Sequence, residues 1–330
     1  MRVEPFSSLK SVEMRNLLRE ERYEWNRQLN WDYSESQRII AGMLETRTLP
    51  GFVAVEENQC VGYVFYLDNS GKGLLGACFV SSRYQGREIE NLLLSKAIEA
   101  LKSDSAIQRI ESQFISLSEW RIRDCFSLHE FECFERIFMI RSSELDPIAP
   151  SPEPFDIRQW SAGDLGEAAG LTVEAYKEGV DRRITFHYQS EPECGRFLEN
   201  LILRPGCGIF LPEAAFSAVD RSSDRLLGYV LSSRISHRDG HIPQIVVAVD
   251  SQGRGIGSAL LRRAIHKLGL SGCTSTSLSV SQANLSAVRL YQKLGFVRRV
   301  QFPTFVWERS GSSAIPNRPR SMSEDRLGTN

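Results

Sequence analysis

The pattern of apolar and polar residues repeats between two distant parts of the chain. Residues 52–66, FVAVEENQCVGYVFY, and residues 216–232, FSAVDRSSDRLLGYVLS, carry two apolar stretches around a polar turn. This pattern predicts two strands joined in a hairpin. In both parts a polar, helix-like region comes before the hairpin, and a strand, a loop and a helix follow it. A further strand, a short helix and an apolar-aromatic strand complete each part.

Three pairs of landmarks keep nearly the same separation along the chain. The offset is 166 residues for the GYV triplets, 167 for two loop glutamines and 165 for the segments FSLHEF and YQKLGF. These pairs begin at Gly62 and Gly228, at Gln85 and Gln252, and at Phe126 and Tyr291. An offset this steady over three landmarks in order indicates an internal duplication. Each copy predicts an α+β or α/β layer built on one mixed sheet.

Domain boundaries follow from composition. The stretch 142–155, SSELDPIAPSPEPF, holds four prolines and no apolar periodicity, which predicts a linker. We therefore expect a first domain over 1–141 and a second over 156–309. Residues 310–330 are polar and poor in apolar residues, which predicts a disordered tail.

Composition narrows the class of protein. A chain of 330 residues suits two domains. The 40 basic and 41 acidic residues give a net charge of −1, which argues against a nucleic-acid partner. No apolar stretch approaches the roughly 18 residues that span a bilayer, and the N-terminus lacks the apolar core of a secretory signal. The seven cysteines contain no CxxC motif, so we expect reduced thiols and a cytoplasmic location.

A buried strand leads into a glycine-rich loop in the second half. The β-branched run IVVAV (245–249) predicts the strand, and QGRGIG (252–257) follows it. Apolar residues then recur at helical spacing from near Ser258 to Leu268, and Gly269 is placed to end this helix. Glycines before a helix N-terminus aim backbone N–H groups at one point, which suits a phosphate or pyrophosphate.

Other glycine motifs fit this loop less well. Ser258 stands where a dinucleotide fingerprint needs its third glycine, and no Gly-Lys-Ser/Thr ending completes a P-loop. Taken alone, the loop is also compatible with a simple tight turn, so that alternative stays open at this point.

A second motif lies in LSVSQANLSAVRLYQKLGF (278–296). A strand precedes Asn284, which can cap a helix, and Gly295 is placed to close that helix. Asn284, Ala287 and Tyr291 recur at helical spacing along one face. The chain thus resembles the GNAT superfamily of N-acetyltransferases on two motifs in the right order, Gln252-x-x-Gly255-x-Gly257 and Asn284-x-x-Ala287-x-x-Leu290-Tyr291-x-x-Leu294-Gly295-Phe296. The resemblance implies an α/β (α+β) fold of two tandem GNAT-like domains, each a mixed, mostly antiparallel sheet flanked by helices.

The resemblance also implies acetyl-CoA as the co-substrate and assigns its contacts. The backbone of Ile245, Val246 and Val247 would pair with the pantetheine arm, and Asn284 would contact the cofactor chain. N–H groups of the loop would hold the pyrophosphate, and that loop comprises Gln252, Gly253, Arg254, Gly255, Ile256, Gly257 and Ser258. One departure is Val249-Asp250-Ser251, where family members often carry a Pro and an aromatic residue.

The same resemblance makes Tyr291 the general acid that protonates the departing CoA thiolate. A phenol with a reference pKa of about 10 can do so without being ionised at neutral pH. A buried aromatic residue without a chemical role is the alternative. The acetyl group would pass directly to a primary amine, on a small molecule or a peptide. We expect no membrane partner, and the oligomeric state is left open.

The family has no fixed base motif. Glu174 and Asp181 lie in the helical region that borders the acceptor site in this fold, and His241 starts the cofactor strand, so Glu174 and His241 are kept as candidates. A surface or capping role is the alternative for each of them. The stretch HRDGH (237–241) could suggest a metal site, but Asp-Gly between apolar strands is a hairpin signal, and we expect no metal.

The first half has lost the residues that would hold the cofactor. Glu88 and Glu90 stand where the second half has Gly255 and Gly257, so two carboxylates replace the anion site. The later motif differs too, with Glu119, Ile122, Phe126 and Glu130 in place of Asn284, Ala287, Tyr291 and Gly295. We predict a degenerate, non-catalytic copy, in which Glu88 or Glu90 substitutes for the missing anion at the helix N-terminus.

The sequence therefore predicts an acetyl-CoA-dependent N-acetyltransferase with its chemistry in the second half. The alternative is a non-catalytic acyl-CoA-binding or regulatory protein, which would keep the loop but would not need the phenol of Tyr291. A structural protein is disfavoured by the intact loop.

Overall fold

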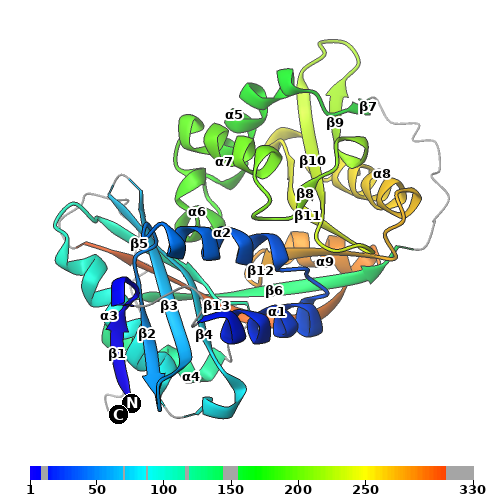
Figure 1. The fold of residues 1–330 in the computed structure, drawn as a ribbon. Helices are drawn as coiled ribbons and strands as arrows, with labels where there is room; N and C mark the ends of the chain where they lie inside the picture. Colours follow the sequence, from blue (N-terminus) through cyan, green and yellow to red (C-terminus); the bar gives the residue numbers. More distant parts are fainter. Residues whose placement is uncertain (9–13, 70, 87, 116–118, 144–154, 310–330) are drawn as a thin grey trace, which may run out of the picture.

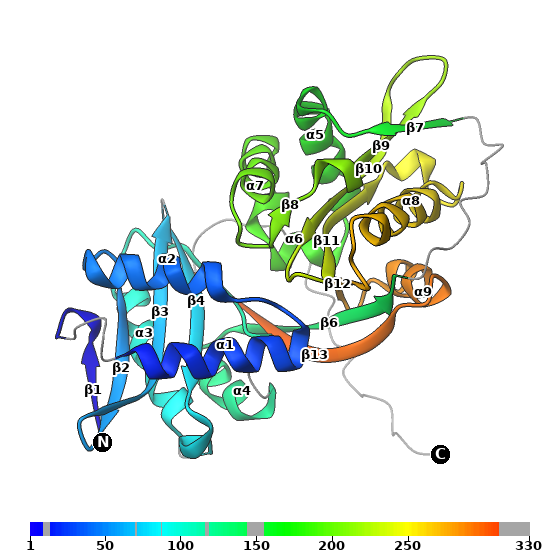
Figure 2. The same cartoon turned by 45° about the vertical axis from the view of Figure 1, so that its right-hand side comes forward.

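Thirteen strands of the described residues form one continuous sheet (Figures 1 and 2). The computed structural model describes residues 1–8, 14–69, 71–86, 88–115, 119–143 and 155–309. The strands are β1 Arg2–Pro5, β2 Gly51–Glu56, β3 Gln59–Asn69, β4 Lys72–Val80, β5 Arg109–Gln113, β6 Glu132–Ser142, β7 Phe155–Gln159, β8 Ile209–Phe210, β9 Phe216–Asp220, β10 Leu226–Arg234, β11 Asp239–Val247, β12 Ser275–Ser281 and β13 Val297–Glu308. Their order in the sheet is β1-β2-β3-β4-β5-β13-β6-β12-β11-β10-β9-β7, with β8 on β10. Among these strands only β4–β5 and β11–β12 pair in parallel, which confirms the predicted mixed, mostly antiparallel class.

The last strand of each half lies in the sheet of the other half. β13 pairs with β5 from Thr304↔Gln113 to Glu308↔Arg109. β6 pairs with the full length of β12, from Ser275↔Ser142 to Ser281↔Arg136. β6 and β13 also pair with each other, so they join the two halves, as Figures 1 and 2 show. The sheet therefore crosses the predicted domain boundary, which stays a prediction. Residues 144–154 of the predicted linker and the predicted tail, 310–330, lie outside the described residues.

Helices cover both faces of the sheet. In the first half, α1 (Arg15–Leu29) and α2 (Ser34–Glu45) pack on one face, and α3 (Ile89–Ser103) and α4 (Glu119–Leu128) pack on the other. In the second half, α5 (Leu165–Tyr176) and α7 (Glu191–Leu203) lie opposite α8 (Ile256–Leu270) and α9 (Leu285–Lys293). The short α6 (Val180–Ile184) follows α5. The 3-10 turns are η1 Phe6–Ser8, η3 Ser82–Tyr84, η4 Ala162–Asp164, η5 Phe186–Tyr188, η6 Pro212–Ala214 and η7 Val249–Ser251.

Both predicted hairpins are confirmed. β2 and β3 join through Glu57 and Asn58, whose φ values of 49° and 61° place both in the left-handed region that tight hairpins favour. Val53 and Val55 face α1 and α2, whereas Ala54 faces α3, because successive strand residues point to opposite faces. β9 and β10 form the equivalent hairpin of the second half.

The predicted end of α8 is wrong. Gly269 lies inside the helix, which begins at Ile256 rather than near Ser258 and continues to Leu270. The residue that ends it is Gly272, whose φ of 90° is the left-handed conformation that closes helices. The preceding strand β11 also stops at Val247, two residues earlier than predicted, because Val249 begins η7.

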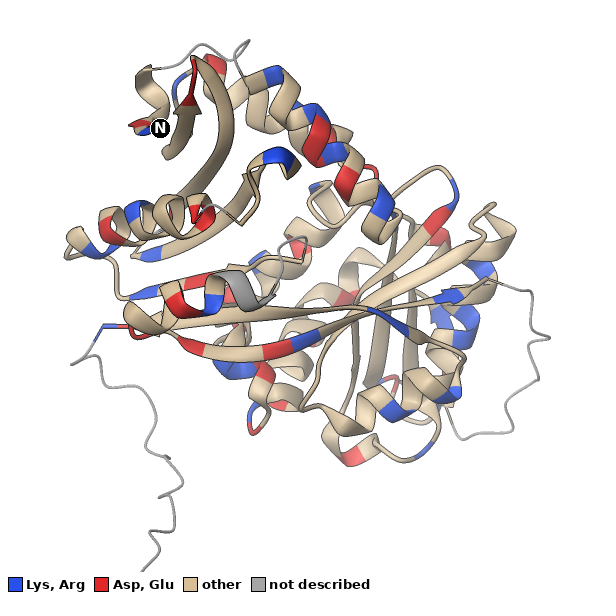
Figure 3. Ribbon diagram, turned by 90° about the horizontal axis from the view of Figure 1, so that it is seen from below, with Lys and Arg blue, Asp and Glu red and all other residues tan. Residues whose placement is uncertain are grey.

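The duplication is visible in the backbone as well as in the sequence. Gly86 and Gly253, which lie 167 residues apart, have φ values of 82° and 77°. Glu130 adopts φ 60° where Gly295 adopts φ 83°, so the first half keeps the turn although its glycine is gone. Figure 3 shows that Lys and Arg are mixed with Asp and Glu on the described helices and strands.

A buried carboxyl group lies between α1 and β3 in the first half. Glu21 is 1% exposed and accepts a hydrogen bond from the Tyr63 hydroxyl at 2.5 Å. Burial raises the pKa of Glu21 from 4.5 to about 7, and the bond from Tyr63 opposes this rise. The group is thus protonated in the folded state at pH values where the unfolded chain has lost the proton.

We expect Glu21→Gln to flatten the pH dependence of stability. A raised folded-state pKa contributes stability that is fully present below about pH 4.5 and is lost as the pH rises through about 7. A shift of this size corresponds to roughly 3 kcal/mol, so the variant should be the more stable protein at pH 8.5. Urea unfolding between pH 5 and 8.5 measures the effect, with Glu57→Gln at the exposed hairpin turn as the control. Parallel pH profiles for Glu21→Gln and the native chain would contradict this assignment.

Candidate active site

The two central strands of the second half separate after four paired residues. β11 and β12 pair in parallel from Asp239↔Ser275 to Ile242↔Leu278. β11 then continues to Val247 with β10 on its other edge. The first residue past the separation is Pro243, which has no N–H to give to a neighbouring strand. The edge of β11 after Ile242 therefore faces an opening.

A pocket of about 700 Å³ occupies this opening. Its walls come from β11, the loop before α8, the start of α9 and the segment after α5. The pocket brings together most of the predicted cofactor contacts, namely Ile245, Val246, Val247, Gln252, Gly253, Gly255, Ile256, Gly257, Ser258 and Asn284, together with Tyr291. Arg254 belongs to the same loop but does not line the pocket.

The glycine loop presents backbone N–H groups to the pocket. Gly253 and Gly255 have φ values of 77° and 84°, and Gly255 is the N-cap of α8. The first helical bond runs from Ala259 N to Gly255 O at 3.0 Å, so the N–H groups of the turn before it lack acceptors within the helix. A Cβ on Gly257 would lie 3.3 Å from Leu290 Cδ2, which leaves little room for a side chain there. Unpaired N–H groups at a helix N-terminus suit an anion such as a pyrophosphate.

Asn284 caps α9 at the opposite wall, as the sequence predicts. Its Oδ1 accepts a hydrogen bond from the backbone N–H of Ala287 at 3.2 Å and one from the Ser286 hydroxyl. Because the cap uses Oδ1, the amide nitrogen of the side chain is available to the pocket. The helix closes at Gly295 as predicted.

Tyr291 lies on α9 and is 7% exposed. Its ring meets the ring of Phe296 edge-on, with centroids 6.0 Å apart. Burial raises the pKa of the Tyr291 phenol, the nearby Asp181 raises it further, and Arg136 opposes the rise. The phenol therefore holds its proton throughout the neutral pH range and can only donate it.

Asp181 is the carboxylate that faces Tyr291 across the pocket. It lies on α6, is 8% exposed and accepts a hydrogen bond from the Ser281 hydroxyl. Next to it, the rings of Tyr176 and Tyr188 stack at 4.3 Å, and the Tyr188 hydroxyl donates to Gln244 Oε1 at 3.0 Å. Sequence reasoning named Asp181 beside Glu174 without a reason to prefer it, and it missed Tyr176, Tyr188, Gln244 and Ser281. No spacing in the sequence links these residues; the fold brings them together.

The structure does not bring the candidates Glu174 and His241 to the pocket. The Glu174 side chain is 66% exposed and pairs with Lys177 at 3.4 Å. His241 is buried between the halves, with its ring 5.1 Å from Trp31 and its Nδ1 2.9 Å from the Ser277 hydroxyl oxygen. Burial lowers the pKa of His241 to about 3. β10 and β11 form a hairpin, as the sequence predicts, but Asp239 and Gly240 are not its turn. They begin β11, and the turn is residues 235–238.

In the first half two equivalent strands also separate, but different residues surround the point of separation. β4 and β5 part after Leu75↔Ser112. Glu88 takes the N-cap of α3 at φ 61°, yet its carboxylate accepts from Asn91 and makes no cap hydrogen bond to the helix. Glu90 is 5% exposed in the first turn. Phe126, at the position of Tyr291, is fully buried and stacks on Phe305 at 3.8 Å. The side chain of Glu119 lies outside the described residues.

The described part of the chain contains neither a metal-type cluster of side chains nor a helix that could cross a membrane. No group of three or more His, Cys, Asp and Glu side chains gathers there as a metal ion would need. None of the helices found in those residues is both long enough and apolar enough to cross a membrane.

The fold and the site define a tandem α/β protein in which one of two related halves keeps a glycine loop before a helix N-terminus, beside the separated strands of the sheet. The sequence pattern of the acetyltransferase (GNAT) family matches residues 11–119 and 176–296. The chain belongs to this family.

Relatives with assigned activities resemble parts of the chain. The mycothiol acetyltransferase of Saccharopolyspora erythraea is 28% identical over 193 residues, which cover 46% of this chain and 63% of that protein. The mycothiol acetyltransferase of Thermobifida fusca is 31% identical over 48% of this chain and 51% of its own length. The N-alpha-acetyltransferase MAK3 of Arabidopsis thaliana is 34% identical over 26% of this chain and 46% of its own length. The chain thus spans about half the length of the curated relatives it matches.

Solved structures resemble nearly the whole fold. A GCN5-related N-acetyltransferase from Sphaerobacter thermophilus has a TM-score of 0.65 and 17% identity over 93% of this chain and 95% of that one. A tandem GNAT protein from the clavulanic acid biosynthesis pathway has a TM-score of 0.59 and 13% identity over 94% and 99%. These likenesses confirm the tandem arrangement of the fold.

Proposed function

We propose that the second half transfers an acetyl group from acetyl-CoA directly to a primary amine. The observation that carries this proposal is one pocket that gathers the glycine loop, the capping Asn284 and the protonated phenol of Tyr291. Binding alone needs the loop, whereas a buried phenol at the junction of cofactor and acceptor serves chemistry. We infer that the first half, which lacks both features, is not catalytic.

The residues present fit acetyl-CoA. N–H groups of the loop, residues 252–258, would hold the pyrophosphate, and the open edge of Ile245, Val246 and Val247 would pair with the amide-containing pantetheine arm. Arg254 offers a positive charge beside the loop. Asn284 would give its side-chain nitrogen to the cofactor. When bound, acetyl-CoA supplies the acetyl group as an activated thioester.

We assign the two proton transfers of the reaction, one from the acceptor amine and one to the leaving thiolate, to two residues. The acceptor must lose a proton to become a nucleophilic amine, and Asp181 is a buried carboxylate that faces Tyr291 and can accept it. Tyr291 donates its proton to the sulfur of the leaving thiolate. Glu174 and His241 have no part in this proposal because neither lines the pocket.

The acceptor is proposed only as a class. Relatives are named for mycothiol and for protein α-amino groups, which are acceptors of small-molecule and peptide type. On the acceptor side the pocket is lined by the ring of Tyr176 and by two carboxylates, Glu178 and Asp181, which favours an ammonium with an apolar or sugar-like neighbour. The cytoplasmic location stays a prediction.

A calorimetric titration with acetyl-CoA, followed by CoA release in the presence of amines, tests the function. We expect one site per chain and turnover with a member of a panel that includes glucosamine, a peptide with a free N-terminus, a lysine peptide and the acceptor of the mycothiol acetyltransferases. Absence of acetyl-CoA binding would refute the proposal. Binding without turnover on any amine would favour the alternative, a non-catalytic acyl-CoA-binding or regulatory protein.

Asp181→Asn and Glu174→Gln form a matched pair for the acceptor side. We expect Asp181→Asn to lower kcat/KM for the amine about a hundredfold at pH 7, because the carboxylate that accepts the proton is lost. The Kd of acetyl-CoA should stay within about twofold, since the loop is untouched. Glu174→Gln should leave both constants unchanged. Equal effects of the two variants would argue against the role of Asp181.

A further inference from the structure

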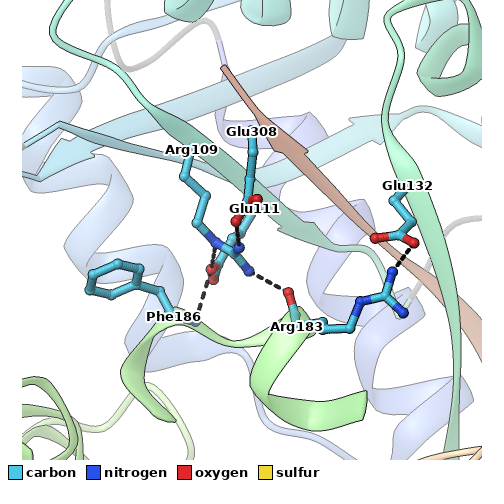
Figure 4. Close-up of polar contacts among 6 residues, drawn as sticks. All are labelled: Arg109, Glu111, Glu132, Arg183, Phe186 and Glu308. Atoms are coloured by element: carbon cyan, nitrogen blue, oxygen red, sulfur yellow. Dashed lines mark hydrogen bonds and ion pairs between the residues drawn. The ribbon is translucent and has the colours of Figure 1, made fainter. Parts of the chain in front are cut away.

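The segment that carries Asp181 rests on the first half of the chain. α6 and η5 lie against β5 and β13, and Figure 4 shows the polar contacts that join them. An α-helix of five residues has too few internal hydrogen bonds to hold its shape alone. The conformation of this segment is therefore set by what it packs against.

Arg109 of β5 is the centre of these contacts. It is 5% exposed, and its guanidinium bonds Glu111 on the same strand and Glu308 on β13. A third bond goes from its Nη2 to the backbone carbonyl of Arg183, at the end of α6 (Figure 4). A buried guanidinium shared by two carboxylates and one carbonyl has its donors fixed in direction, which fixes the carbonyl in turn.

Glu111 binds the other end of the turn. Its Oε1 accepts a hydrogen bond from the backbone N–H of Phe186 at 2.9 Å, in addition to the bond from Arg109. The Phe186 ring lies under the ammonium of Lys72, 3.1 Å from the ring centroid. Arg109 and Glu111 thus hold the Arg183 carbonyl near the end of α6 and the first N–H of η5.

Apolar packing and an ion pair complete the contact. Ile184 is fully buried against Phe134 of β6 and Val306 of β13. The Arg183 side chain reaches Glu132 of β6, as Figure 4 shows. Residues of β5, β6 and β13, in the sheet that the halves share, thus surround a single turn of the second half.

We propose that the degenerate first half is a positioning element for the acceptor side of the pocket. Arg109 and Glu111 hold residues 180–188. This segment carries Asp181, which lines the pocket, and Tyr188, which stacks on the pocket residue Tyr176. Arg109 is a positioning residue, because it touches the segment and not the pocket. The catalytic consequence rests on the proposed function, whereas the effect on the segment does not.

Amide hydrogen exchange and titration on Arg109→Gln test the proposal. We expect exchange across residues 181–188, the Phe186 amide included, to accelerate roughly tenfold or more, because the segment loses its fixed carbonyl. The Kd of acetyl-CoA should stay within about twofold, whereas the KM for the best amine of the panel should rise roughly tenfold. Glu111→Gln removes the charge but keeps an acceptor for Phe186, and it should give the same effects at smaller size. If Arg109→Gln does not fold, Glu111→Gln tests the proposal in its place.

Tyr63→Phe is the matched control. It removes a buried hydrogen bond from the first half without touching α6 or η5. We expect amide exchange to accelerate only in residues 181–188 in the Arg109 and Glu111 variants. Tyr63→Phe should not accelerate exchange in this segment. Unchanged exchange in this segment, or an equal rise in all three variants, would overturn the proposal. Failure of the native chain to bind acetyl-CoA would refute the proposed function instead, and the exchange result would still decide this inference.

Discussion

Tyr291→Phe is expected to lower kcat by about two to three orders of magnitude, the usual contribution of a positioned general acid. The variant keeps the ring and its contact with Phe296 and removes only the hydroxyl. Without the phenolic proton, the CoA sulfur must leave as a thiolate or take its proton from water. Steady-state kinetics of CoA release measure kcat, and calorimetry with acetyl-CoA measures whether the variant still binds the cofactor.

The Kd of acetyl-CoA should change by no more than about twofold in the same variant, because the loop that would hold the pyrophosphate is intact. Since burial and Asp181 raise the pKa of Tyr291, the native kcat should not fall through ionisation of this phenol up to about pH 9. An undiminished kcat in Tyr291→Phe would reduce Tyr291 to a packing residue.

Gly255→Glu is expected to weaken acetyl-CoA binding by about two orders of magnitude. The substitution copies the first half, where Glu88 holds the N-cap of α3. Two unit charges about 5 Å apart repel by roughly 3 kcal/mol at an effective dielectric of 20, which corresponds to at least a hundredfold in affinity. Calorimetric titration of the variant against the native chain measures the loss.

Gly255→Gln separates charge from backbone strain. Both substitutions put a side chain on a residue with φ 84°, and a Cβ there meets no atom within 4 Å. Glu88 adopts φ 61° at the corresponding position, so a long side chain is compatible with this turn. We expect Gly255→Gln to lose no more than about tenfold in affinity, which is the cost of a strained φ. Equal losses in the two variants would show that sterics, rather than charge, protect the site.

Local features of the fold could be predicted because short stretches of the sequence determine them. The hairpin turn at Glu57 and Asn58, the Asn284 cap and the Gly295 closure each depend on a few neighbouring residues. The helix end at Gly269 was predicted wrongly because two glycines stand near that end, and only the backbone shows that Gly272 takes the left-handed conformation.

The exchange of β6 and β13 could not be predicted from the sequence. Alternation along a strand specifies which face is buried, but it does not specify the neighbouring strand. Only the full chain determines which arrangement forms.

The candidate site was predictable on its cofactor side and not on its acceptor side. Loop and cap residues form contiguous motifs, whereas Asp181 gains its place by packing against Ser281 on a strand a hundred residues away. Glu174 lies seven residues earlier in the same helical region, and the sequence offers no reason to prefer one carboxylate. His241 was misleading for a related reason, since its surroundings come from Trp31 of the first half.

The exchanged strands also bear on how this gene can change. A deletion of the first copy would remove β6, and the edge of β12 that faces away from β11 would lose its partner. A deletion of the second copy would likewise expose β5. Unpaired edges invite aggregation, so neither copy can be lost without harm to the other. A copy without the glycine loop is thus expected to be preserved by selection on its neighbour, with more substitutions in its loops than in its strands.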